Sequence, residues 1–385
     1  MNRQQLLSRL GRRGWQVVYT TGALSVWDRK SDAWRNAPLF GRQQEMDGVR
    51  VDFPGRFPPL WPSHPRYNTW AIARYCHALR RRASSRKRKD SIAYLFLPRY
   101  LPCALALECR YLVYHVVDDY SKMPGWGASS ERLENEIIER ADLLIGTTAL
   151  ALDRLPSGGS ALRCVLPNGG DAKAFSVGPN LPCPEDLAAI PRPRIGYCGH
   201  LNRKVDFNLV AAVASARPDW HWVMIGPVTG SDGHPSSDPT VAHGYADCQR
   251  LPNVHFLGIR PVSALPSYVG QTDVNVICYR HDDGGWWNAC YPLKVHEYLA
   301  CGKPVVSSPI PAVMQFGRVI DIAVTEAEWF RALEAAITSG GTGTPDERRA
   351  IAFENTWDMR VDQLDAWLTE MIESKRGRSV HGHDF

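Results

Sequence analysis

The segment Asn288–Pro309, NACYPLKVHEYLACGKPVVSSP, has the pattern of a turn, a helix and a buried strand. Pro292 suits the first turn of a helix and Gly302 suits its C-terminal stop, so we expect a helix over Pro292–Cys301. The apolar run that follows predicts a strand over Pro304–Ser307. A short apolar strand after an amphipathic helix is typical of parallel α/β architecture.

Two charged residues of this expected helix are candidates for ligand binding. Lys294 and Glu297 are three residues apart and therefore share one helix face. A cation near a helix start opposes the helix dipole, and a bound diphosphate would turn that cost into a favourable interaction. Glu297 is suited to accept hydrogen bonds from two vicinal ribose hydroxyls. The alternative is a surface ion pair between the two residues, worth roughly a few tenths of a kcal/mol.

A second informative segment is Arg194–Val210, RIGYCGHLNRKVDFNLV, which predicts a strand over Arg194–Cys198, a short polar loop after Gly199 and a helix from near Asp206. In a doubly wound sheet the intervening loop lies at the carboxyl edge, where ligands bind. Backbone N–H groups at a helix start suit phosphate oxygens, and Arg203 or Lys204 would add positive charge. The alternative is an ordinary strand-to-helix turn that carries two exposed cations.

A third segment, Leu251–Tyr279, reads LPNVHFLGIRPVSALPSYVGQTDVNVICY and predicts a strand, a turn, a helix and a strand. Most of its residues are core positions. Its turn at Gly258, Ile259 and Arg260 lies where a nucleotide base could rest on backbone groups, so Gly258 is a further candidate for donor binding.

Taken together and in this order, the three segments closely resemble the donor-binding half of retaining GT-B glycosyltransferases of family four, in a bacterial polysaccharide branch. The family pattern is a YxGHxxxKxD loop, then PNVxFLGxxPxxxLPxY, then PLKxYEYLAxGKPVV. The matching residues here are Tyr197, Gly199, His200, Lys204 and Asp206; then Pro252, Asn253, Val254, Phe256, Leu257, Gly258, Pro261, Leu265, Pro266 and Tyr268; then Pro292, Leu293, Lys294, Glu297, Tyr298, Leu299, Ala300, Gly302, Lys303, Pro304, Val305 and Val306. The terminal ENTWDMRVDQL resembles the helix with which this family crosses back to its first domain.

The resemblance implies an α/β protein of two Rossmann-like, doubly wound domains that face each other across a cleft. It also implies that Gly199, His200 and Lys204 surround the donor diphosphate, that Lys294 assists them, and that Glu297 holds the ribose. Family chemistry retains the anomeric configuration and uses a nucleotide sugar with no metal or other cofactor. The freed phosphate oxygen takes the acceptor proton, so no protein nucleophile is needed, and cations stabilise the charge of the leaving diphosphate.

The chain departs from the family pattern at Ala289. Many members have a Glu there, eight residues before the ribose-binding Glu, which contacts the donor sugar. We expect the sugar to be held instead by the Asn288 side chain and by main-chain donors from Ala289 to Tyr291. The alternative is that Asn288 caps the helix or ends a loop.

In the first half, YHVVDDY, ERADLLIGTT and VLPNGGDAKAF also resemble the family. Asp118 is expected at a strand end facing the cleft where the acceptor arrives, with Asp119 pointing the other way in an extended chain. With Lys204, these two are the catalytic candidates; the alternative is that they are solvated turn carboxylates. His115, in mid-strand, is expected to be a packed histidine.

Apolar runs and helix-period segments alternate along the whole chain, which predicts residues 1–175 as an acceptor-binding domain, 176–193 as a linker, 194–356 as a nucleotide-sugar-binding domain and 357–385 as a terminal helix and tail. Further expected strands are Trp15–Thr21, Val49–Phe53, Ser91–Leu97, Leu112–Val117, Leu143–Thr147 and Cys164–Pro167, and further helices are Gln4–Arg13, Asn68–Arg82, Ser129–Ala141 and Ala149–Leu155. Thr229–Asp247 is polar and rich in Gly and Pro, which predicts a loop. The chain opens inside a helix, so the first strand of the N-terminal domain is missing: either translation starts upstream of Met1 or this domain is unusually built.

The net charge of +5 is unevenly distributed. Through residue 175 there are 27 Lys and Arg against 16 Asp and Glu (+11), which leaves 45 − 27 = 18 against 40 − 16 = 24 (−6) for the remainder. The basic half favours an anionic partner, either nucleic acid or an acidic membrane surface. The densest cluster contains Arg80, Arg81, Arg82, Arg86, Lys87, Arg88 and Lys89, and its alternative interpretation is a solvated helix end. Ten scattered cysteines without a metal-type spacing, and the lack of a signal-like start, indicate a cytoplasmic protein, peripheral on the inner face of the plasma membrane.

The predicted partners are therefore a nucleotide-sugar donor, a glycan or lipid-linked acceptor and an anionic membrane, with no nucleic acid. Two other functions stay open at this level. A GT-B sugar-nucleotide epimerase would act without an acceptor. A non-catalytic nucleic-acid-binding or assembly protein would show salt-dependent binding to RNA or DNA.

Overall fold

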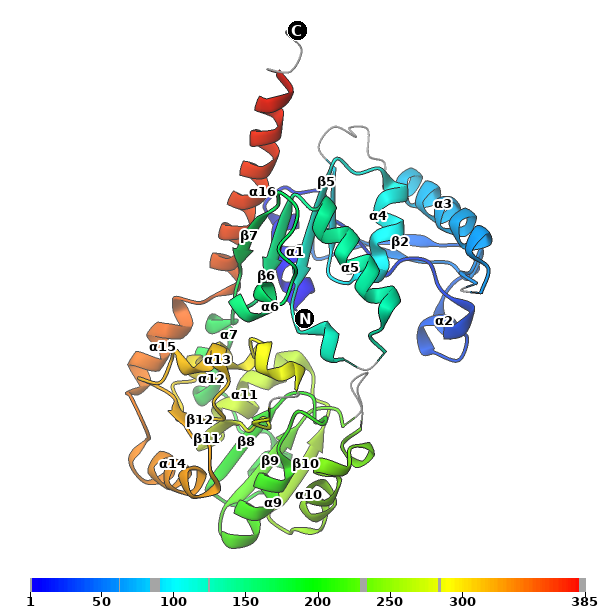
Figure 1. The fold of residues 1–385 in the computed structure, drawn as a ribbon. Coiled ribbons are helices and arrows are strands. Elements are labelled where there is room, and N and C mark those ends of the chain that lie inside the picture. The colour runs from blue at the N-terminus through cyan, green and yellow to red at the C-terminus, as the bar shows by residue number, and fades with distance from the viewer. Residues whose placement is uncertain are drawn as a thin grey trace. The chain divides into compact units, whose positions relative to one another are not determined.

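The computed structural model describes residues 2–61, 63–83, 91–123, 125–228, 234–282 and 285–380. The chain forms two compact units (Figure 1). Unit 1 comprises Met1–Val117, Gly127–Leu166 and Arg360–Phe385, and unit 2 comprises Asp118–Trp126 and Pro167–Met359. The boundary expected after residue 175 thus lies inside unit 2, as does the segment that carries Asp118 and Asp119.

Unit 1 contains two small sheets. In the first, β4 (Ile92–Leu95), β5 (Tyr111–Val116), β6 (Leu143–Gly146) and β7 (Leu162–Val165) are parallel and lie in this order. The second has the order β1 (Val18–Thr20), β3 (Val49–Phe53) and β2 (Arg42–Met46), with β2 antiparallel to β3. The helices of this unit include α1 (Asn2–Arg12), α2 (Asp32–Asn36), α3 (Pro65–Arg82), α4 (Leu101–Leu107), α5 (Ala128–Arg140) and α6 (Ala149–Asp153).

Helix α1 precedes the first described strand, as the sequence predicts. β1 has three residues and pairs with β3, so the described strands before α3 do not extend the β4–β7 sheet. Sequence analysis did not predict β2, because Arg42–Met46 is largely exposed and polar and lacks the apolar alternation of a half-buried strand.

Unit 2 has a six-stranded sheet with parallel pairing throughout, in the order β10-β9-β8-β11-β12-β13. Its strands are β8 (Arg194–Cys198), β9 (His221–Ile225), β10 (Val254–Gly258), β11 (Val274–Ile277), β12 (Val305–Ser307) and β13 (Asp321–Ile322). Numbered within the unit, this order is 3-2-1-4-5-6, the order of dinucleotide-binding sheets. The order in which the chain adds strands changes direction between the parallel neighbours β8 and β11. A ligand is expected to bind at the carboxyl ends of these two strands.

The helices of unit 2 include α7 (Ala172–Ser176), α8 (Glu185–Ala188), α9 (Phe207–Ala216), α10 (Pro239–Arg250), α11 (Leu265–Gly270), α12 (Lys294–Ala300), α14 (Glu326–Ser339) and α15 (Pro345–Phe353). A large apolar core joins the sheet to α9, α12 and α14. The expected linker, 176–193, contains α8 and belongs to this unit.

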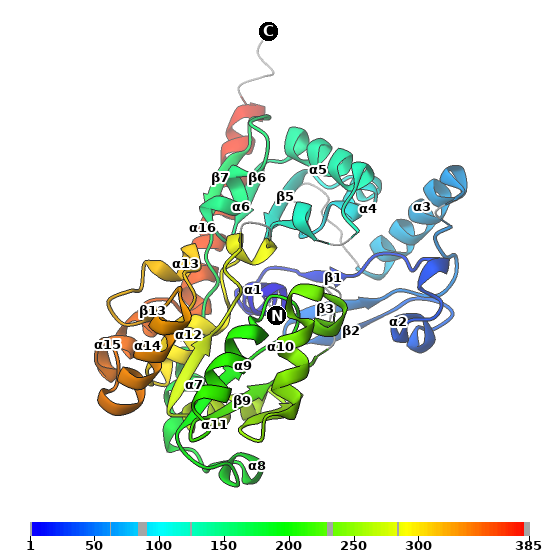
Figure 2. The same cartoon turned by 60° about the horizontal axis from the view of Figure 1, so that its bottom comes forward.

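The prediction of a loop over Thr229–Asp247 is wrong for its second part, which begins α10. The Asp238 side chain caps the helix and Pro239 occupies its first turn. Gly244, which was counted as a loop signal, instead lets α10 approach α9: a Cβ on it would lie 2.5 Å from the Asn208 backbone nitrogen. Figure 2 shows the two helices side by side next to β9.

Two other helices bear on the predictions. Sequence analysis missed α15, although Thr344 and Glu347 form a capping box at its start. Helix α16 (Trp357–Val380) begins in unit 2 and belongs to unit 1 from Arg360 on. There its buried residues Val361, Leu364, Leu368 and Met371 recur at helical spacing.

Candidate active site at the sheet switch point

Two lysines lie over a floor of aromatic rings beyond the carboxyl ends of β8 and β11. The Lys294 ammonium is 3.4 Å from the centre of the Tyr197 ring and 5.3 Å from that of Tyr279. The Lys204 ammonium is 5.2 Å from the Tyr279 ring centre and 5.4 Å from that of Trp286. The Tyr279 ring therefore lies within cation–π range of both charges. This arrangement concentrates positive charge at the switch point.

Lys294 is a buried cation without a counter-charge. It is the first residue of α12, only 7% of its surface is exposed, and its Nζ has no hydrogen-bond partner among the described residues. Burial, together with the charge of Lys204, lowers the pKa of Lys294 to about 7. A buried, unpaired ammonium is costly, and it is retained where a ligand supplies the missing negative charge.

Gly199 makes room for this ammonium. Its φ of +147° lies in a region that L side chains rarely adopt, and a Cβ on it would lie 2.8 Å from Lys294 Nζ. Gly226, at the end of β9, has a φ of +138°, and a Cβ there would lie 2.1 Å from the Gly199 carbonyl oxygen. The loop after β8 can therefore hold its position only with glycine at both places.

Glu297 lies one turn along α12 and does not neutralise Lys294. Both residues are described, and no ion pair within 4.0 Å joins them, so the surface ion pair considered from the sequence is not formed. Burial raises the pKa of Glu297 to about 7, with Lys294 opposing the rise and Asp171 adding to it. The carboxyl group is thus available to a ligand.

Asp118 and Asp119 have different surroundings. Asp119 is buried and caps a short 3-10 helix, Tyr120–Lys122, by accepting hydrogen bonds from Ser121 N (3.2 Å) and Ser121 Oγ (2.5 Å). Asp118 follows β5 by two residues and so lies at the carboxyl end of this strand. Burial raises the pKa of the Cys290 thiol to about 12, with Asp118 adding to the rise and Lys204 and Lys294 opposing it. Asp118, Lys204 and Lys294 therefore all lie within electrostatic range of the Cys290 thiol.

The remaining predicted residues surround this centre. His200 is exposed, and its carbonyl accepts a hydrogen bond of 3.0 Å from Tyr197 Oη. The Nε of Arg203 is buried without a partner among the described residues. Gly258 ends β10 with a φ of +70°, and its carbonyl accepts from Gly226 N at 2.9 Å.

The loop before α12 is held by Asn288. Its Nδ2 donates to the Asp282 carbonyl at 2.5 Å, an interaction that fits the loop-ending alternative for this residue. Ala289 is buried at the end of a 3-10 helix over Trp286–Ala289. Sequence analysis did not assign a role to Tyr279 and Trp286; the position of Tyr279 at the end of an apolar strand was the available signal, but an aromatic residue there equally suits the core.

A hollow of about 450 Å³ borders the lysine site. It is lined by Asp206, Asn208, Leu209, Ala212, Tyr279, His281, Ser308, Val324, Glu326 and Trp329. Tyr279, which lies under both ammonium groups, also lines this hollow, so the two spaces adjoin. Among the described residues, no group of three or more His, Cys, Asp or Glu side chains is placed to hold a metal ion.

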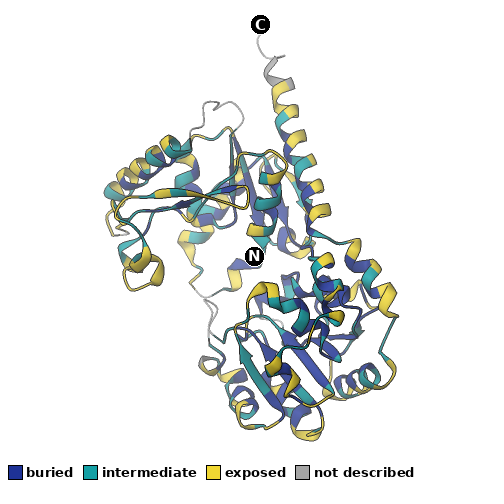
Figure 3. Cartoon of the chain, turned by 180° about the vertical axis from the view of Figure 1, so that it is seen from behind, coloured by how far each residue is buried: buried dark blue, intermediate teal, exposed yellow. Residues whose placement is uncertain are grey.

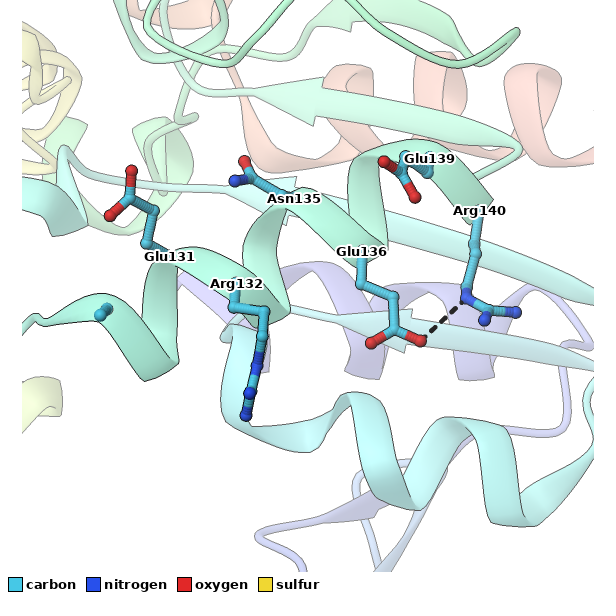
Figure 4. Close-up of a pocket in the computed structure, with 7 residues that line it drawn as sticks. Glu131, Arg132, Asn135, Glu136, Glu139 and Arg140 are labelled. Atoms are coloured by element: carbon cyan, nitrogen blue, oxygen red, sulfur yellow. Dashed lines mark ion pairs between the residues drawn. The ribbon is translucent and has the colours of Figure 1, made fainter.

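In unit 1, His115 is fully buried, as expected, and its Nδ1 lies 2.8 Å from Tyr94 Oη. Burial, with the nearby charge of Arg3, lowers the pKa of His115 to about 3, so the ring is neutral. A groove of about 520 Å³ runs over α5. Figure 4 shows that charged side chains of this single helix line it, with Arg140 and Glu136 paired at 3.0 Å, so it is an ordinary solvated helix face.

Comparison with known proteins agrees with this geometry. Residues 192–339 match the family model described as "Glycosyl transferases group 1". The chain is 26% identical over 239 residues to a Bacillus subtilis (strain 168) protein described as the teichuronic acid biosynthesis glycosyltransferase TuaH. That match covers 60% of this chain and 57% of the relative's own length. The residues matched by the family model all lie in unit 2.

Solved structures show the same fold for the whole chain. The UDP-forming α,α-trehalose-phosphate synthase of Burkholderia xenovorans matches with a TM-score of 0.67 at 14% identity, covering 96% of each chain. Anabaena HepE, solved in complex with UDP and glucose, matches with a TM-score of 0.60 at 19% identity, covering 78% of this chain and 81% of its own. The fold is that of GT-B glycosyltransferases: two Rossmann-like α/β domains.

Proposed function

We propose that the protein transfers a sugar from a nucleotide-diphosphate sugar to an acceptor, with retention of anomeric configuration and without a metal ion. The observation that carries this proposal is the buried ammonium of Lys294, which has no partner among the described residues and lies beside Lys204 at the switch point of the sheet. Two adjacent cations that form no ion pair within the described part of the chain favour a ligand with more than one negative charge. A diphosphate meets this requirement.

In the proposed reaction the two lysines stabilise the leaving group. As the bond between the anomeric carbon and the diphosphate breaks, negative charge grows on the leaving phosphate oxygens, and fixed cations in a water-poor site stabilise that charge. The freed phosphate oxygen is then the base that takes the proton of the acceptor hydroxyl. Asp118, whose charge acts on the same Cys290 thiol as the two lysines, is assigned to binding of the acceptor. Glu297 is assigned to the ribose hydroxyls of the donor.

For the donor, the solved complexes of similar proteins favour UDP sugars: HepE holds UDP and glucose, and the Escherichia coli trehalose-6-phosphate protein holds UDP-2-fluoroglucose. For the acceptor, the relative described as a teichuronic acid glycosyltransferase favours a glycan or a lipid-linked glycan in polysaccharide biosynthesis. Such donors and acceptors are available at the cytoplasmic face of the plasma membrane, where we place the reaction.

The test is turnover of a panel of nucleotide sugars with glycan and lipid-linked acceptors, followed by release of nucleoside diphosphate. We expect release that depends on the acceptor and a product whose anomeric proton coupling matches that of the donor. Lys294→Ala should lower turnover more than a hundredfold, because a charge-assisted hydrogen bond gained in the transition state is lost. The exposed Lys173, on α7 of the same unit, provides the control Lys173→Ala. Donor epimerisation without any acceptor, or inversion at the anomeric carbon, would contradict the proposal.

A further inference from the structure

Helix α3 of unit 1 has two contrasting faces. Its inner face contributes buried Ala71, Tyr75, Cys76 and Leu79, and packs against α4. Its outer face carries exposed residues at spacings of three and four, which places them on one stripe of the helix. They are Arg66, Trp70, Arg74, His77 and Arg81. Figure 3 shows the exposed stripe along this helix.

The stripe is basic without local compensation. The sequence of α3, PRYNTWAIARYCHALRRR, contains five arginines and no acidic residue. In the described part of the chain, no carboxylate forms an ion pair with Arg66, Arg74 or Arg81. Their guanidinium groups therefore face solvent as uncompensated cations.

Of the basic cluster identified in the sequence, only part carries charge that faces outward. Arg80 turns inward to the Ala106 carbonyl and to Glu108, and Arg82 pairs at 2.7 Å with the buried carboxylate of Asp52. Arg86, Lys87, Arg88 and Lys89 lie outside the described residues. Of the described cluster residues, Arg81 is thus the one whose charge faces outward.

Exposed indole rings accompany the basic stripe. Trp70, on the stripe itself, is 47% exposed, Trp61 is 46% exposed and Trp27 is 73% exposed. Trp61 N donates to Asn68 Oδ1 at 2.6 Å, which fixes Trp61 at the first turn of α3. Trp27 and Trp61 lie on neighbouring segments, because Val26 N, just before Trp27, donates to the carbonyl of Leu60, just before Trp61, at 2.9 Å. The segments that carry the three tryptophans are therefore in contact with one another.

We propose that this region, formed by Arg66, Trp70, Arg74 and Arg81 of α3 with Trp27 and Trp61, binds the anionic headgroups of a lipid bilayer. Arginines on a helix that lies in the bilayer surface attract anionic lipid, and indole rings favour the interface between headgroups and hydrocarbon. Leu39 and Phe57, which are 57% and 54% exposed and joined by a backbone hydrogen bond of 3.1 Å, add apolar surface beside it. A hydrocarbon boundary accommodates aliphatic and aromatic side chains of this kind. The region goes beyond the transferase reaction and does not depend on it.

The test is flotation of the purified full-length chain with vesicles of phosphatidylcholine alone and with added phosphatidylglycerol. We expect binding to the anionic vesicles only, and the variant R66Q/R74Q/R81Q should bind them about 100-fold more weakly, because each basic residue near the surface contributes about a factor of five. Trp70→Ser should weaken binding roughly tenfold and do so at high salt as well, because indole burial is not screened. The matched control is R250Q/R318Q/R331Q, which removes the same charge from exposed positions of unit 2.

Four outcomes would overturn the proposal: no binding to anionic vesicles, equal binding to both vesicle types, equal loss in the control variant, or displacement of the protein from vesicles by single-stranded RNA at equal phosphate concentration. Titration of each variant with nucleoside diphosphate separates this surface from the active site. Affinity for the nucleotide should be unchanged in R66Q/R74Q/R81Q, so a failure of the lipid proposal leaves the proposed function untouched, and the converse also holds.

Discussion

Replacing Lys294 by Met should stabilise the ligand-free protein while weakening its response to nucleotide. The lysine is buried without a partner among the described residues, and burial, with Lys204, lowers its pKa from 10.5 to about 7. A difference of about 3.5 pKa units between unfolded and folded protein corresponds to a ceiling of about 5 kcal/mol. The Lys204 contribution and local relaxation reduce this, so we expect Lys294→Met to gain about 2–3 kcal/mol at neutral pH, in the range found when buried charges are replaced by apolar residues.

The pH dependence gives the sign of the effect. Because the folded-state pKa lies below the unfolded one, the cost of the buried ammonium is fully present below about pH 7 and disappears as the pH rises toward 10.5. The ceiling on the stability difference between Lys294→Met and the natural sequence is therefore about 5 kcal/mol at pH 6.5 and about 1.5 kcal/mol at pH 9.5.

The assay is thermal unfolding followed by intrinsic fluorescence at both pH values, with and without nucleoside diphosphate. At pH 6.5 we expect Lys294→Met to melt roughly 5–10 °C higher than the natural sequence, and the gap to narrow at pH 9.5. Nucleotide should raise the melting temperature of the natural sequence more than that of the variant, since loss of the ammonium weakens binding roughly ten- to a hundredfold. Lys173→Met, at an exposed position, should change stability by less than about 0.5 kcal/mol. A variant that melts lower, or a gap that is the same at both pH values, would refute the burial of a charged Lys294.

Three further predictions concern the same site. Glu297→Gln should weaken nucleoside diphosphates but not inorganic pyrophosphate in calorimetric titrations, because its assigned partner is the ribose; equal losses would place its effect on the phosphates or on folding. Gly199→Ala should lower diphosphate affinity more than tenfold, because its Cβ would lie 2.8 Å from Lys294 Nζ and its φ is unfavourable for Ala; an unchanged dissociation constant would show that the loop adapts. Asn288→Ala should reduce turnover and narrow the preference between epimeric donors at constant diphosphate affinity; a loss of stability with an unchanged donor ranking would make the contact with Asp282 purely structural.

The sequence predicted the parts of the fold that depend on local pattern. β3 and β8 occupy their expected residues, because apolar runs bounded by turn signals leave few alternatives for a buried strand. The loop prediction failed where α10 begins, because Gly244 serves a close contact with Asn208 on another helix, and no local pattern reports such a contact. The domain boundary was misplaced for a similar reason, since Pro167–Phe175 joins unit 2 through tertiary packing such as that of Phe175 in the large core.

The predicted site residues could be named from the sequence, but not their electrostatic state. The spacing of Lys294 and Glu297 allowed either an ion pair or two separate ligand contacts, and only the fold shows that they do not pair. The aromatic floor of Tyr279 and Trp286 was not predicted either, because a ring beneath a cation and a ring in the core have the same sequence signal. The sequence did not distinguish Asp118 from Asp119. In the structure the Asp119 carboxylate accepts two hydrogen bonds from Ser121, which gives it a capping role that the sequence did not predict.

The central claim is that Lys204 and Lys294 form the binding site for the donor diphosphate, and the most direct measurement is calorimetric titration of UDP into the natural sequence, Lys204→Ala, Lys294→Ala and the control Lys173→Ala. A charge-assisted hydrogen bond is worth roughly 1.5–3 kcal/mol, so each active-site variant should bind roughly ten- to a hundredfold more weakly. The control should bind like the natural sequence. Because Lys294 has a pKa of about 7 without ligand and takes up a proton on binding a diphosphate, the natural sequence at pH 8 should also absorb protons from the buffer, and Lys294→Ala should absorb fewer. Undiminished affinity in both active-site variants would contradict the assignment of the site.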